Sequence, residues 1–78
     1  MNYPKSTGRA RQFRLWDAQA KRPMRWRCYK HRENAHNGAC LEMRWAVVGA
    51  VIEVYSASTG RLLGQYCRGI DVIYFTEG

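Results

Sequence analysis

Basic and aromatic side chains are concentrated in residues 9–32, which read RARQFRLWDAQAKRPMRWRCYKHR. Residues 1–32 contain ten of the thirteen Lys and Arg residues and a single acid, Asp17, which gives 10 − 1 = +9. Residues 33–78 contain three basic residues and five acids, or 3 − 5 = −2, so the N-terminal part carries the whole net charge of +7. Arginine neutralises phosphates, and aromatic rings stack on unpaired bases. The pattern therefore favours contact with a polyanion.

Eight residues are the candidate contacts for this polyanion, and the interleaved aromatic rings favour single-stranded nucleic acid as its class. The arginines would hold phosphates, while Trp16 and Tyr29 would stack on bases. The eight residues are Arg11, Arg14, Trp16, Arg22, Arg25, Arg27, Tyr29 and Lys30.

The same residue types support a second interpretation, because arginine and aromatic residues are also enriched at protein interfaces. In this interpretation the protein is an adaptor or inhibitor that docks on an acidic partner surface, or a homodimer formed through a sheet edge. The small size and the richness in arginine and tryptophan resemble those of accessory proteins from mobile elements. A third interpretation is a basic face that is merely solvated.

Cysteine and histidine residues occur at a spacing that could bind zinc. Cys28, His31, His36 and Cys40 form the pattern C-x2-H-x4-H-x3-C, and Zn²⁺ accepts two thiolates and two imidazoles in a tetrahedron. The spacing resembles that of a zinc knuckle, C-x2-C-x4-H-x4-C. It differs in having a histidine as the second ligand and a last gap one residue shorter. Zinc is therefore a secondary expectation, and no cofactor is the primary one.

Other catalytic patterns are weak, so we expect no enzyme. Cys28 or Cys40 has a histidine nearby, but the sequence indicates no orienting third group for nucleophilic catalysis. The six acids are dispersed, and no glycine-rich phosphate loop is present.

The length of 78 residues predicts one domain. We expect a flexible N-terminal arm over residues 1–8 and a single globular domain over 9–78. The longest apolar run, 45–52, is far shorter than the roughly 20 residues of a membrane span. Three cysteines and the lack of an apolar leader favour a reducing, cytoplasmic location with no membrane contact.

Residues 11–16 and 24–30 alternate in polarity and predict a first β-hairpin. Its inner face is expected to contain Phe13, Leu15, Met24, Trp26 and Cys28. Its outer face is expected to contain Arg14, Trp16, Arg25, Arg27 and Tyr29.

Residues 51–55 and 61–67 predict a second hairpin, closed by a turn in which Gly60 supplies the positive φ angle. Residues 70–75 predict a last strand.

Residues 35–48 fit a helix that begins after an Asn34 N-cap and ends at Gly49. Leu41, Trp45 and Val48 would form its buried stripe, which Ala39, Met43, Ala46 and Val47 would widen. A competing interpretation turns at Asn37-Gly38 into a strand over 39–48.

These elements predict an α+β fold of order ββαββ(β), with one helix packed on a mostly antiparallel sheet. The alternative, if 39–48 is a strand, is a small all-β barrel. The expected core consists of Phe13, Leu15, Trp26, Leu41, Trp45, Val48, Ile52, Val54, Leu62, Tyr66, Val72 and Tyr74.

Overall fold

The computed structural model describes residues 12–78, apart from the side chains of Arg25 and Trp26. The predicted arm over residues 1–8 and the candidate contact Arg11 lie outside the described residues. The elements are β1 (Phe13–Asp17), β2 (Arg22–Tyr29), α1 (Arg32–Trp45), β3 (Val51–Ser56), β4 (Arg61–Arg68) and β5 (Ile73–Glu77). This order confirms the predicted α+β class.

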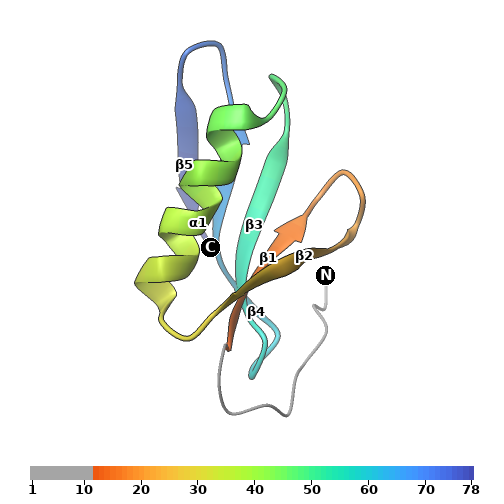
Figure 1. Cartoon of the computed structure of the whole chain (residues 1–78), viewed down its shortest axis with the longest axis vertical. Coiled ribbons are helices and arrows are strands. Elements are labelled where there is room, and N and C mark those ends of the chain that lie inside the picture. Colours follow the sequence, from red (N-terminus) through yellow and green to blue (C-terminus); the bar gives the residue numbers. More distant parts are fainter. Residues whose placement is uncertain (1–11) are drawn as a thin grey trace.

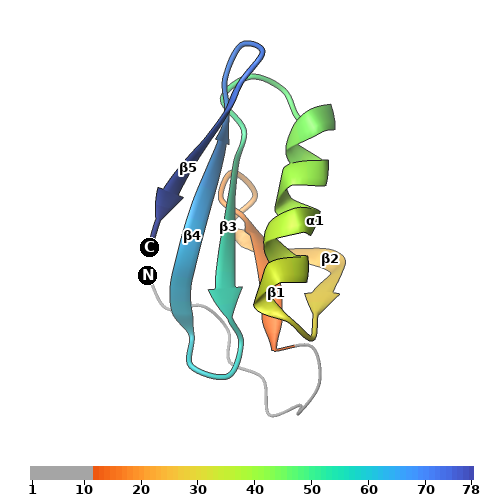
Figure 2. The same cartoon turned by 90° about the vertical axis from the view of Figure 1, so that its left-hand side faces the viewer.

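The five strands form one antiparallel sheet in the order β2-β1-β3-β4-β5. The helix α1 lies across one face of this sheet, as Figures 1 and 2 show. Strands β2 and β5 are the two edges of the open sheet. The all-β barrel alternative is therefore wrong, because its additional strand is helical and the sheet does not close.

The main core lies between α1 and the sheet. Four sheet residues that the sequence indicates as core are buried there: Leu15, Ile52, Val54 and Tyr66. On the helix side, the core consists of two small residues, Ala35 and Ala39, and of the larger Met43. A smaller cluster of Trp16, Tyr55 and Ala57 is buried separately from this core.

The helix is present, but the centre of the predicted buried stripe is wrong, and of the residues expected to widen it Ala39 and Met43 are buried. Leu41, Trp45 and Val48 are all exposed, Trp45 to 87%. The buried face is instead Ala35, Gly38, Ala39 and Met43, which follows the same helical spacing. The sheet supplies the bulky side chains of this interface, so the helix approaches it with its small residues. Val72 and Tyr74 are also expected in the core, but both are exposed. Val72 directly precedes β5, and Tyr74 lies within it.

The ends of α1 differ from the expected caps. The N-cap residue is His31, which makes no side-chain capping bond, so the helix starts before Asn34. At the other end the helix stops at Trp45, and Ala50 N–H donates to the Val47 carbonyl at 3.0 Å. Gly49, with a φ angle of 92°, therefore closes a tight turn into β3 rather than capping the helix. Within residues 12–78, no helix is long and apolar enough to cross a membrane.

Candidate functional site

A hollow of about 1040 Å³ lies between the β1–β2 hairpin and α1. Three of the predicted contact residues, Arg14, Arg22 and Arg27, line it together. The described residues that complete its lining are Asp17, Pro23, Met24 and Glu42. The structure thus brings three arginines of the candidate set to one place, beside two acids that the sequence does not single out.

An irregularity in the hairpin forms this hollow. Arg14 pairs with Cys28, whereas Trp16 pairs with Pro23. On β1, only Leu15 lies between these two pairs, whereas four residues of β2, 24–27, lie between them. The regular pairing of the two strands is therefore interrupted at this point. A bulge of this kind re-aims side chains and bends its strand.

The expected division of β2 into inner and outer faces is wrong because the bulge shifts the alternation. Arg27 and Tyr29, expected on the outer face, both lie toward α1, where Tyr29 packs against the core. Cys28, expected inside, pairs in register with Arg14, which is expected outside. The expected outer surface is therefore not a single exposed face, because Tyr29 packs against the main core and Trp16 belongs to the separate buried cluster.

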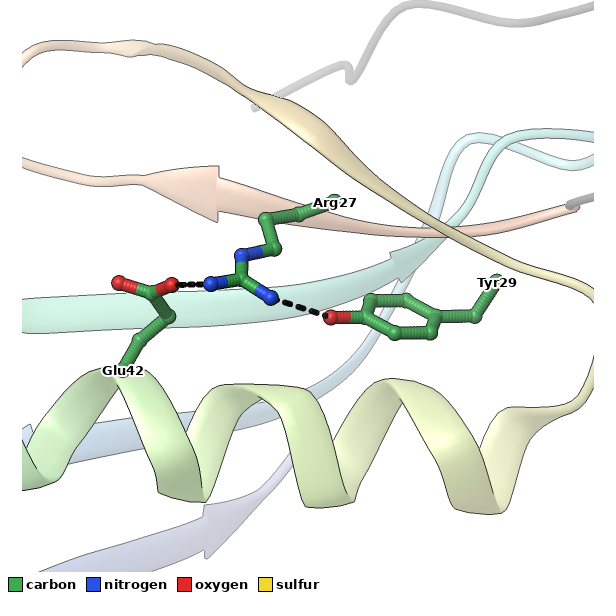
Figure 3. Close-up of polar contacts among 3 residues, drawn as sticks. All are labelled: Arg27, Tyr29 and Glu42. Carbon is green, nitrogen blue, oxygen red and sulfur yellow. Dashed lines mark hydrogen bonds and ion pairs between the residues drawn. The ribbon is translucent and has the colours of Figure 1, made fainter.

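Arg27 connects the hairpin to the helix (Figure 3). Its Nη2 forms an ion pair with Glu42 Oε1 of α1, and its Nη1 donates to the Tyr29 hydroxyl at 3.5 Å. The hydrogen bond that Arg27 donates to Tyr29 and the charge of Glu42 raise the pKa of Arg27 above its ordinary value, although burial opposes them. Arg27 therefore stays charged and is held at the wall of the hollow.

Arg14 lines the hollow from β1. Its Nε atom is buried and makes no hydrogen bond to any residue that the structure describes. A buried guanidinium N–H without an acceptor is costly.

The two predicted stacking residues are both partly or fully covered. Trp16 is only 7% exposed and meets the Tyr55 ring edge-on, with ring centroids 6.2 Å apart. Tyr29 is half-buried with its hydroxyl against Gly38 of α1. Their burial does not favour stacking on bases, and a stacking role for these two residues stays a prediction.

The exposed cations lie at separate places in the described part of the chain. Lys21 and Arg22 are at the β1–β2 turn, whereas Lys30 and Arg32 are near the start of α1. Arg61 begins β4. Among the described residues, the cations therefore do not merge into one continuous basic wall.

An apolar hollow of about 240 Å³ continues from the first one along the C-terminal end of α1. The two hollows share Asp17, Met24 and Glu42. The apolar part is lined further by Trp45, Ala46, Val47, Ala50, Val51 and Ile52, together with the polar Gln19. We call the two hollows together the interaction groove. Sequence reasoning missed Trp45 as a surface residue because its spacing from Leu41 indicates a core position.

The possible zinc ligands do not converge. No group of three or more His, Cys, Asp or Glu side chains within the described residues could hold a metal ion. Cys28 lies on β2 beside Arg14, and His31 is exposed. Cys40 belongs to α1 and packs against the main core. All three cysteines are free thiols.

His36 has a polar role in the helix–sheet interface instead. Its Nδ1 lies 2.7 Å from the Tyr66 hydroxyl, and Arg32 Nε donates to its Nε2 at 3.4 Å. Burial, and to a smaller extent the Arg32 charge, lowers the pKa of His36. Burial, and then Cys40, raises the pKa of Tyr66 to about 12. Both side chains are therefore neutral at pH 7 and joined by a hydrogen bond.

The sequence matches no family model, and comparison with curated proteins and with solved structures gives no match.

Proposed function

We propose that this protein is a small non-enzymatic protein-interaction module whose interaction groove receives a segment of a partner protein. The partner segment has an apolar side chain that occupies the Trp45 end of the groove. Acidic side chains beside it face the arginines at the other end.

The exposure of Trp45 is the observation that carries this proposal. At 87% exposure the indole contributes almost nothing to this protein's own core. Tryptophan is costly to leave in water, and it is among the residues that contribute most to binding at protein interfaces. Leu41, Val47 and Val48 are also exposed near it on α1 and the following loop, and a grouping of exposed apolar residues is typical of an interaction site.

The arginine end of the groove supports an acidic partner. Arg14, Arg22 and Arg27 line it against Asp17 and Glu42, so its lining charge is 3 − 2 = +1. The chain as a whole carries +7. A net positive protein attracts an acidic one and is steered toward it. Arginine also binds carboxylates in a planar, two-point geometry.

Selection of peptides from a random display library tests this proposal, because it does not require the partner to be identified first. We expect the selected peptides to combine aromatic or aliphatic residues with Asp or Glu. Their binding, measured by fluorescence polarisation, should weaken about tenfold or more in Trp45→Ser and in Arg22→Glu, as for a contact worth more than about 1.4 kcal/mol.

Arg61→Glu is the matched control, because it makes the same charge change at an exposed arginine at the start of β4, which is not part of the groove lining. The peptides should bind this variant almost as well as the original protein. Equal losses in Arg22→Glu and Arg61→Glu would indicate attraction by net charge alone. Binding that ignores Trp45→Ser would contradict the proposal.

Contact with a polyanion is the second candidate function, and the net charge of +7 is the observation that favours it. Titration with labelled single-stranded RNA, single-stranded DNA and duplex at two salt concentrations tests it. Phosphate contacts release counterions, so a true complex should weaken steeply as salt rises. Since Trp16 is buried and Tyr29 is half-buried, we expect little preference for single strands. A cytoplasmic location fits either function and stays a prediction from the cysteine content.

A further inference from the structure

The outer edge of β5 is open in the part of the chain that the structure describes. Two bonds fix which of its backbone groups face outward: Gly69 N–H donates to the Val72 carbonyl at 2.8 Å, and Gly78 N–H donates to the Leu63 carbonyl at 3.2 Å. Hydrogen-bonded pairs alternate along an antiparallel ladder, and the β4–β5 register has no shift. The N–H and C=O groups of Ile73, Phe75 and Glu77 therefore point away from β4.

The two sheet edges are protected very differently. Edge β2 has Pro23, an irregular register and three arginines, all of which discourage another strand from pairing. Edge β5, with the sequence IYFTE, has no proline, no lysine and no bulge. Its Tyr74 and Phe75 are 59% and 50% exposed. Strand β5 is therefore the edge at which a further strand can add.

We propose that β5 pairs with β5 of a second copy of this chain, antiparallel and around a two-fold axis at Phe75. This register places Phe75 opposite Phe75 of the other copy, and Ile73 opposite Glu77. All three pairs are then hydrogen-bonded pairs, so every outward N–H and C=O of Ile73, Phe75 and Glu77 finds a partner. The two sheets become one continuous ten-stranded sheet.

The side chains favour a second copy as the occupant, and the distribution of basic charge permits one. Phe75 already packs against Tyr66 and His36, with ring centroids 4.9 Å and 5.7 Å away, and a second Phe75 would extend this aromatic cluster. Residues 69–78 contain two acids and no basic residue, or 0 − 2 = −2, in a chain of net charge +7. Because the β5 segment has no basic residue, pairing there brings no Lys or Arg of the two segments together. The closed two-fold pairing also stops at the dimer.

Sedimentation equilibrium over a concentration series from about 5 µM to about 500 µM tests this inference, since dimerisation follows mass action. We expect a mass twice that of the 9.1 kDa chain at the upper end. Phe75→Lys places like charges at the axis, and Glu77→Pro removes an outward N–H without removing a bond to β4. Both variants should shift the dissociation constant upward by about tenfold or more, while circular dichroism shows the fold retained.

Trp45→Ser is the matched control, because it removes an exposed aromatic residue from the interaction groove and leaves β5 unchanged. It should dimerise like the original chain. The inference is overturned by a monomer at all concentrations, by open-ended polymers, by a dimer that both β5 variants leave intact, or by a dimer that Trp45→Ser disrupts. Because the groove and the β5 edge are tested by different variants, either proposal can fail alone.

Discussion

The hydroxyl of Tyr29 lies where Gly38 would place a Cβ atom if it had one. A glycine inside a helix costs about 1 kcal/mol relative to alanine, and this contact explains why α1 has one. The hairpin and the helix therefore approach each other closely at this point.

Gly38→Ala should destabilise the protein despite the better helix propensity of alanine. The added Cβ would overlap the Tyr29 phenol, and overpacking of this kind costs about 1–3 kcal/mol. Urea denaturation measures the change. In a Tyr29→Phe background the hydroxyl is gone, so the same substitution should cost less. A stabilised Gly38→Ala protein would mean that Tyr29 and Gly38 are not in contact.

Trp45→Ser should change the free energy of unfolding by less than about 0.5 kcal/mol, as is usual for an exposed side chain. Met43→Ala, two residues away but fully buried, should cost about 2–5 kcal/mol. Thermal and urea unfolding of the two variants make the comparison. The reverse order would show that α1 packs on its Leu41–Trp45 stripe, as its spacing indicates.

The Arg27–Glu42 ion pair should contribute little to stability, because its side chains are 39% and 26% exposed and solvent screens such pairs. A double-mutant cycle with Arg27→Met and Glu42→Gln should give a coupling energy below about 1 kcal/mol. The coupling should decrease as salt rises. A larger, salt-insensitive coupling would mean that the pair is a structural element of the hairpin–helix contact.

Stability should fall as the pH falls below about 6.5, partly because of His36. Burial and then Arg32 lower the pKa of His36 in the folded state from 6.5, so the unfolded chain binds the proton first as the medium becomes acidic. Urea unfolding at about pH 7.5 and about pH 5.5 measures this slope. His36→Gln should flatten it, whereas the exposed His31→Gln should not. Identical slopes in both variants would assign the pH dependence to other groups.

The sequence was sufficient to predict the second hairpin and the fold class, and the reason is local. Residues 51–55 are β-branched or aromatic around one acid, and the STG turn supplies the positive φ angle of Gly60, 73° in the structure. The structure places the hairpin at Val51–Ser56 and Arg61–Arg68. Such signals do not depend on the rest of the chain.

Which face of α1 is buried could not be predicted in the same way. Two stripes on the helix have suitable spacing: one large, with Leu41 and Trp45, and one small, with Ala35 and Ala39. The choice depends on the volume that the sheet supplies, above all from residues such as Tyr66, and is therefore a tertiary property. The β2 bulge is similar, because the alternation of residues 24–30 looks regular until its partner strand is known. The arrangement of the candidate residues depends on tertiary structure for the same reason: Arg14, Arg22 and Arg27 line one hollow, whereas Trp16 is buried and Tyr29 is half-buried.

The most direct test of the interaction groove is a titration of ¹⁵N-labelled protein with a selected acidic, apolar peptide, followed at the tryptophan indole N–H signals. Trp16 is an internal reference, because it is buried outside the groove lining. We predict that the Trp45 indole signal shifts as the peptide binds and that the Trp16 signal stays in place. An unmoved Trp45 signal in a saturated complex would contradict the account.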